Sequence, residues 1–421
     1  MIDMKRDSRR SLPSLGLLLA VAACGGETGA PAWSVVVDTL SNGAVRIVNT
    51  PPAEGAEPVW WIEEEVRIGS LDGGGPATFG EVRGIGALPD GRIAVMETQS
   101  QEVRVFGPDG VHLATYGGEG QGPGEIGGST GLMVAPDHRL WVPDTRNARM
   151  SIFDADSGYV TGYPMRLIVR GYIWEGVMRP DGGVLKPSIL LDEDRTRVIR
   201  VFDATMTLTD SIPLPRQQEL DQEDPPTAFV FEGENGTSYR SVPFYPFSMS
   251  LIDPDGTVWS TTFADPSYRI FHWRPQGDTT LVIETNRDRL AVTPAERDSV
   301  MAQIREEFPG APAPDWSKIP DVKPAISSMH LSAEGQLWVR RPSTDGLTHY
   351  DVYDRDGRLA GGAATALGVW PYLSPVVRGG EFWALVTDEL DVPYVVRGRL
   401  VPFECRSGAA AAERETTCLD R

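Results

Sequence analysis

One short motif recurs six times along the chain, and it constrains the fold more than any other feature. It is a turn of the Pro-Asp-Gly type followed by an apolar pair that often ends in Trp. The copies span residues 89–94, 136–141, 180–185, 254–259, 333–338 and 378–383. A turn-and-strand unit that repeats roughly every 45 residues is typical of a β-propeller, where each repeat forms one blade. We therefore expect an all-β fold, a six-bladed β-propeller.

A second regular spacing supports this prediction. After the turn comes a predicted strand in which apolar and polar residues alternate and whose last residue is Phe. This Phe lies twelve residues after the end of the motif in three copies, from Ala94 to Phe106, Trp141 to Phe153 and Trp259 to Phe271. Neighbouring blades stack face to face, so large aromatic side chains at one repeated position are expected to fill the space between them.

Two junctions between copies are longer than the rest, which predicts insertions at about 204–247 and 278–325. The first contains an acidic, Pro-rich stretch that reads as a solvated loop. Insertions on a regular scaffold often carry specificity.

The second insertion predicts one short helix. Residues 293–296 read Thr-Pro-Ala-Glu, a capping box with Pro at the first helical position. Val300, Ile304 and Phe308 then share one helical face. We expect this amphipathic helix to lie on the propeller.

The N-terminus has the pattern of an export signal. Basic residues come first, and the apolar stretch 15–22 is too short to span a bilayer. Small residues then precede Cys24, which resembles a bacterial lipobox and predicts a signal peptide at 1–23, lipidation of Cys24 and a tether at 24–32. Gly25 resembles the residue that directs sorting to the outer membrane. The alternative is an ordinary signal peptide with Cys24 incidental.

The remaining cysteines, Cys405 and Cys418, both lie in a predicted C-terminal tail at 404–421, which follows the propeller at 33–403. An exported chain meets an oxidising compartment, so we expect them to form a disulfide. Two free thiols are the alternative. Within 33–70 we expect a hairpin with its turn at 41–43 and a strand that completes the last blade, for which 65–69 is the best candidate.

The net charge of −20 restricts the partners. Nucleic acid requires a basic face, and anionic headgroups are repelled by an acidic surface. We expect a monomer at the bacterial cell envelope, attached to the membrane only by its lipid and facing the periplasm or the surface.

The second blade carries a family motif. Residues 142–153, Val-Pro-Asp-Thr-Arg-Asn-Ala-Arg-Met-Ser-Ile-Phe, look like the NHL core pattern, and the Gly-rich run 118–125 looks like the segment that opens such blades. The chain thus resembles the NHL-type six-bladed propellers of the TolB-like superfamily, over about 60–400 and best in the first two blades. Such proteins include ligand-binding proteins, scaffolds, lyases and lactonases, so the resemblance implies a fold and not a chemistry.

Strings that could carry chemistry have simpler explanations. A Gly-x-Ser-x-Gly string at 127–131 and a Gly-x-Gly-x-x-Gly string at 122–127 lack the following helix that a nucleophile elbow or a dinucleotide site needs. Acidic strings at 154–158 and 354–357 fit hairpin turns better than calcium loops. None of the five His shows metal-binding spacing. We assign no catalytic residue, no metal and no cofactor.

The repeat does define one candidate site. Equivalent positions in a propeller form a ring about its axis. Six residues before each turn lie Arg83, Thr130, Trp174, Ser248, Ser327 and Tyr372. We expect these side chains to converge at one mouth of the channel and to suit a polar or anionic small molecule. A water-filled mouth with ordinary polar lining is the alternative.

These patterns favour an exported ligand-binding or protein-interaction module whose partner is an envelope protein or a small polar or anionic ligand. The alternative function is a channel-based hydrolase or lyase of the lactonase kind.

Overall fold

The computed structural model describes residues 34–51, 59–71, 73–165, 174–192, 196–214, 226–233, 236–262, 264–275, 277 and 279–406. The expected signal peptide, Cys24, the tether and most of the C-terminal tail lie outside this part of the chain. Regular structure within it is almost entirely strand, with one α-helix and two short 3₁₀ segments, so the all-β prediction is confirmed.

The strands follow one another in antiparallel units of four. The first three units are separate sheets: β4(Val82–Ala87), β5(Ile93–Glu97), β6(Glu102–Phe106), β7(His112–Gly117); β8(Met133–Val134), β9(Leu140–Asp144), β10(Arg149–Asp154), β11(Gly158–Pro164); and β12(Val177–Met178), β13(Val184–Ile189), β14(Arg197–Phe202), β15(Leu208–Pro213). The next two are β18(Ser250–Ile252), β19(Val258–Ser260), β20(Arg269–Trp273), β21(Thr279–Thr285), and β22(Ser328–Leu331), β23(Leu337–Arg341), β24(Thr348–Tyr353), β25(Leu359–Thr365). The last strands, β26(Val376–Arg378), β27(Glu381–Thr387) and β28(Pro393–Pro402), join β3(Trp60–Ile68).

Each copy of the sequence motif has the same place in this scheme. Its turn joins the first strand of a unit to the second, and its apolar pair lies in the second strand, as in β8–β9 and β12–β13. The turn requires a left-handed residue, which is Gly91 at φ +82° in the first copy and His138 at φ +68° in the second.

The first strands of adjacent units approach one another closely. Strand β8 contacts both β4 and β12, and β4 also contacts β26. A Cβ atom on Gly84 would lie 2.6 Å from Cβ of Leu132, and one on Gly131 would lie 2.6 Å from Cβ of Trp174. Units whose first strands meet in this way are arranged as the blades of a β-propeller.

The N-terminal strand completes the last unit, as expected. Strand β3 pairs antiparallel with β28 over a longer range than 65–69, and it also makes a short parallel pairing with β25. Before it, β1(Ser34–Thr39) and β2(Val45–Thr50) form the predicted hairpin, and β2 pairs parallel with β21. The described N-terminal residues therefore run along the outer edges of three successive units.

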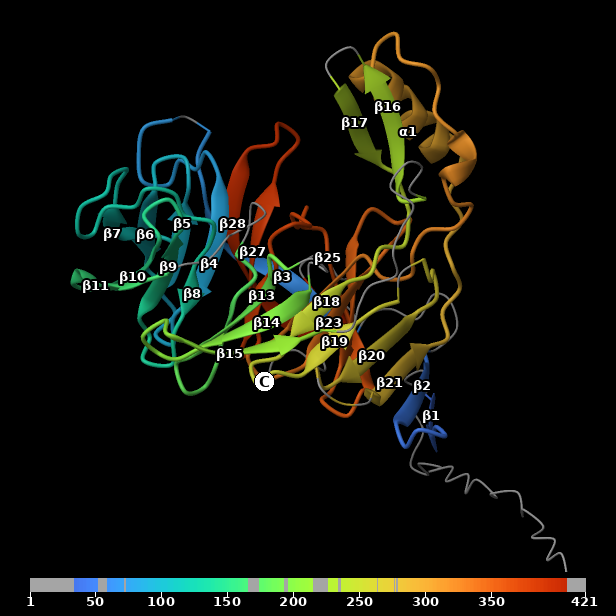
Figure 1. The fold of residues 1–421 in the computed structure, drawn as a ribbon, viewed down its shortest axis with the longest axis horizontal. Coiled ribbons are helices and arrows are strands. Elements are labelled where there is room, and N and C mark those ends of the chain that lie inside the picture. Colours follow the sequence, from blue (N-terminus) through green and yellow to red (C-terminus); the bar gives the residue numbers. More distant parts are fainter. Residues whose placement is uncertain are drawn as a thin grey trace, which may run out of the picture.

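The two insertions meet in one place. Strands β16(Ala228–Gly233) and β17(Gly236–Ser241) form a hairpin, and α1(Pro294–Glu307) lies beside it, away from the other sheets (Figure 1). We call β16, β17 and α1 the arm. Thr293 caps the helix by the predicted capping box.

The expectation that the helix lies on the propeller was wrong. Ile304 and Phe308 pack with Phe229 and Phe231 of β16, and the Phe231 and Phe308 rings stack with centroids 4.0 Å apart. The apolar face predicted from the sequence is therefore covered by the other insertion. No helix in the described ranges is long and apolar enough to cross a membrane.

Candidate functional site

The residues of the NHL-like motif hold a loop in the second unit. Asp144 is fully buried, and its Oδ1 accepts the backbone N–H groups of Gly127 and Gly128 at 2.9 and 3.2 Å. Arg149 contacts Oδ2 of Asp144 at 3.1 Å and donates to the carbonyl of Gly122 at 2.7 Å. The motif thus fixes the Gly-rich segment before β8, which is a structural role.

The Gly-x-Ser-x-Gly string belongs to the same loop. Ser129 is buried and its hydroxyl donates to the carbonyl of Gly131 at 3.0 Å. The acidic string at 154–158 is also a turn, because Oδ1 of Asp154 accepts the N–H groups of Asp156 and Ser157, both at 3.0 Å. Both sequence interpretations agree with this geometry.

The first unit repeats the loop-holding arrangement with Glu97. Its Oε1 accepts the N–H groups of Gly80 and Glu81 at 3.2 and 2.9 Å. A cation from the next strand, Arg104, lies 3.7 Å from this buried carboxylate. An acid at the end of the second strand therefore anchors the preceding loop in both units.

The fifth unit exchanges these charges. Strand register pairs Val95 with Arg104 in the first unit and Val339 with Asp351 in the fifth. Arg341 consequently occupies the position of Glu97, and Asp351 occupies that of Arg104. The two side chains lie 3.6 Å apart, from Nε of Arg341 to Oδ1 of Asp351. A guanidinium cannot accept backbone N–H groups, so Arg341 cannot hold its loop as Glu97 and Asp144 do.

A pocket of about 290 Å³ lies at this position. Its lining is donor-rich and contains no carboxylate: Ser327, Ser328, Arg340, Arg341, Pro342, Ser343, Leu347, Thr348 and Pro371. We call it the arginine pocket. Sequence reasoning placed Ser327 at a binding site but missed both arginines. Aligning the ends of the second strands would have revealed Arg341 where two other units carry an acid.

Hydrogen bonds fix the orientation of both arginines. Arg341 donates from Nη2 to Nδ1 of His349 at 3.0 Å, and His349 lies 2.7 Å from Oδ2 of Asp345 through Nε2. These contacts assign the ring proton to Nε2. Burial, and then the charge of Arg341, lower the pKa of His349, so its ring is neutral at neutral pH. Arg340 donates to the carbonyl of Val369 at 2.9 Å.

Asp351 leaves Arg341 only partly neutralised. Arg287 binds both oxygens of Asp351, at 2.6 and 2.9 Å, and the Tyr268 hydroxyl donates to it at 2.8 Å. Nε of Arg341 is buried without a hydrogen-bond partner, and burial lowers the pKa of this guanidinium. Arg287 and Arg341 thus share the single carboxylate of Asp351, and Arg287 makes the closer contacts.

The six predicted ring residues have different surroundings. Trp174 donates its backbone N–H to the Thr130 carbonyl at 2.7 Å, and both residues are buried. Ser327 lines the arginine pocket together with Pro371, the neighbour of Tyr372. Tyr372 itself is 72% exposed and packs on Trp370.

The other two ring residues also lie at first strands. Arg83, in β4, forms a 2.7 Å ion pair with Glu81, and Ser248 precedes β18. Convergence of all six side chains on one ligand stays a prediction.

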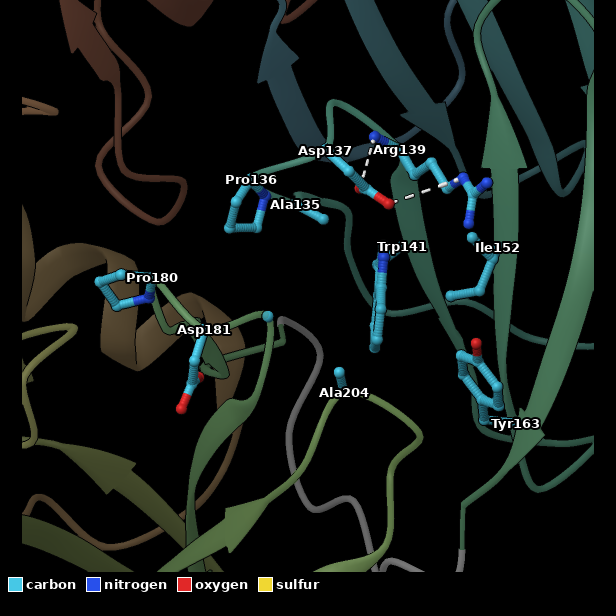
Figure 2. Close-up of a pocket in the computed structure, with 11 residues that line it drawn as sticks. Ala135, Pro136, Asp137, Arg139, Trp141, Ile152, Tyr163, Pro180, Asp181 and Ala204 are labelled. Carbon is cyan, nitrogen blue, oxygen red and sulfur yellow. Dashed lines mark hydrogen bonds and ion pairs between the residues drawn. The ribbon is translucent and has the colours of Figure 1, made fainter.

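A second pocket of about 290 Å³ lies between the second and third units, beside two of the repeated turns (Figure 2). We call it the turn pocket. Its lining is Ala135, Pro136, Asp137, Arg139, Trp141, Ile152, Tyr163, Pro180, Asp181, Gly182 and Ala204.

Two further sequence predictions concern metals and cysteines. Among the residues that the structure describes, no group of three or more His, Cys, Asp or Glu side chains is placed to hold a metal ion. Cys405 is disulfide-bonded. Its expected partner Cys418 lies outside the described residues, so the pairing stays a prediction.

No family model and no curated protein matches the chain. Similar solved structures include a member of the DUF4221 family from Bacteroides vulgatus, with TM-score 0.46 and 9% identity, covering 82% of this chain and 96% of that one. A streptogramin B lyase has TM-score 0.42 and 11% identity, covering 81% and 98%. Regucalcin from Agrobacterium tumefaciens, described as a calcium-binding protein, has TM-score 0.38 and 12% identity, covering 81% and 96%. Similarity this remote carries no functional assignment.

Proposed function

We propose that this chain is an exported, six-bladed propeller of the NHL type that binds a small anionic ligand in the arginine pocket. The observation that carries the proposal is the charge exchange in the fifth unit, where Arg341 stands in the place of the loop-holding acid. Six four-stranded units that share one turn position support the blade number. The lipobox-like sequence supports attachment at the envelope through Cys24.

The lining of the arginine pocket favours an anion over other ligands. Two guanidinium groups are held in place before a ligand arrives, and the surrounding hydroxyls of Ser327 and Ser328 supply further donors. Fixed, charge-assisted donors bind carboxylates and phosphates strongly, since little side-chain freedom is lost on binding. A volume near 290 Å³ suits a ligand the size of a small organic acid or sugar phosphate.

Thermal unfolding in the presence of paired ligands tests this function. Organic acids and sugar phosphates should raise the melting temperature increasingly with concentration, because they bind only the native state. Their uncharged analogues should give no response that depends on Arg341. Arg341→Gln should abolish the response, whereas Arg358→Gln, on an exposed turn of the same unit, should preserve it. Equal responses in the two variants would reject the arginine pocket as the site.

A further inference from the structure

The turn pocket has a distinct chemistry at the opposite end of the strands. It lies where the second strand β9 begins, whereas the arginine pocket lies where the second strand β23 ends. Its walls are mixed, with Trp141 and Tyr163 on one side, Pro136 and Pro180 on the other, and charged side chains at the rim (Figure 2). A ligand that fits here offers both an apolar surface and polar groups.

Trp141 meets the pocket with its ring and not with its N–H. The side chain is only 5% exposed, and its indole nitrogen is enclosed without a hydrogen-bond partner. The same is true of Trp259, Trp338 and Trp383 at the same repeat position, so the enclosed N–H is a property of the repeat. What distinguishes Trp141 is that its ring lines a pocket. A ligand there can pack against this ring.

The rim carries carboxylates whose charge is already balanced. One oxygen of Asp137 accepts the N–H of Arg139 at 3.2 Å, and the other lies 3.6 Å from the Arg139 guanidinium. Asp181 accepts the N–H of Gly183 at 3.0 Å and pairs with Arg179 at 2.9 Å. Each acid therefore has a cation beside it, and the rim offers both acceptors and donors without a large net charge.

We propose that the turn pocket binds a neutral sugar ring. A pyranose has an apolar C–H face for the proline and aromatic rings and hydroxyls for the two Asp–Arg pairs. The balanced rim disfavours a free cation or anion, since either would leave one member of each pair opposed to it. The volume of about 290 Å³ accommodates one ring and part of a second.

The test uses methyl glycosides of common hexoses and N-acetylhexosamines, measured by ligand-observed NMR and calorimetry on the full mature chain. At least one glycoside should bind. Trp141→Phe makes the ring that lines the pocket smaller, so affinity should fall about tenfold. Trp259→Phe makes the same change in another unit and should leave affinity unchanged.

A second variant keeps the test informative if Trp141→Phe folds poorly. Ala204 is exposed at the edge of the turn pocket, so Ala204→Phe should fill the pocket without disturbing the core and should abolish glycoside binding. The proposal is overturned if no glycoside binds, if Trp141→Phe and Trp259→Phe act alike, or if alkylammonium ions bind in place of sugars. None of these outcomes bears on the arginine pocket, which Arg341→Gln tests separately.

Discussion

Arg341 and Asp351 lie 3.6 Å apart in the fifth unit, with their charges exchanged relative to Glu97 and Arg104 in the first. The exchange converts a position that closes a loop into one that presents a cation. The replacement of an acid by Arg341 at a repeated register thus places a guanidinium group in the arginine pocket of an acidic protein.

The two arginines near Asp351 should differ in their importance for stability. Arg287 makes two short hydrogen bonds to this buried carboxylate, whereas Arg341 makes none. Arg287→Gln should therefore lower the free energy of unfolding by about 3 kcal/mol, because it leaves a buried charge poorly paired. Arg341→Gln should cost about 1 kcal/mol. Urea unfolding measures both, and an equal cost would contradict the assignment of Arg287 as the main partner.

The left-handed His138 should be a site of easy stabilisation. Its φ of +68° matches that of glycines in the other turns and is unfavourable for a residue with a Cβ. His138→Gly should raise the free energy of unfolding by about 1 kcal/mol. The matched control is Gly256→Ala at φ +92°, where little else crowds the new Cβ, and it should destabilise by a similar amount. Stabilisation by neither change, or by both, would refute this explanation.

The buried His330 should make the fold sensitive to acid. Burial lowers its pKa to about 3, so the unfolded state takes up a proton before the folded state does. The resulting stability is fully present above about pH 6.5 and decreases as the pH falls toward 3, by about 3 kcal/mol between pH 7 and pH 4. His330→Phe keeps a ring between Trp338 and Tyr350 and should weaken this dependence. Urea titrations at several pH values would disprove the role of His330 if both proteins lost stability equally.

The arm should unfold locally without affecting the blades. Its apolar cluster shares no residue with the clusters of the other units, and it includes the Phe231–Phe308 stack. Phe231→Ala should increase hydrogen exchange in 228–241 and 294–307 and leave 82–106 protected. Loss of protection in both regions would show that the arm is part of the common core.

The sequence predicted the turns and the start of the helix, because residues close together in the chain determine both. The six turns were recognisable because Pro, Asp and Gly prefer the same backbone geometry wherever they occur. Thr293 and Glu296 likewise marked the start of α1 through contacts within one helical turn. The position of that helix depends on Phe229 and Phe231, more than sixty residues earlier, and no local pattern specifies such a contact.

The candidate site, like the helix, was predicted only where a local repeat determines the position of a residue. A fixed offset from each turn selected Ser327, which lines the arginine pocket, and Tyr372, which is exposed beside Trp370. The offset identifies positions along the chain and does not determine which side chains share a pocket. Strand register places Arg341 opposite His349, in the position where Asp144 lies opposite Arg149, and so distinguishes it from the loop-holding acids.

The most direct measurement of the central claim is calorimetric titration of the protein with one sugar phosphate and with the same sugar lacking phosphate. We predict saturable binding of the phosphate that weakens with added salt and is lost in Arg341→Gln, whereas any heat from the sugar alone should be the same in Arg341→Gln and the unaltered protein. Phosphate binding that is unchanged in Arg341→Gln, or absent from the unaltered protein across a panel of phosphates and organic acids, would contradict it.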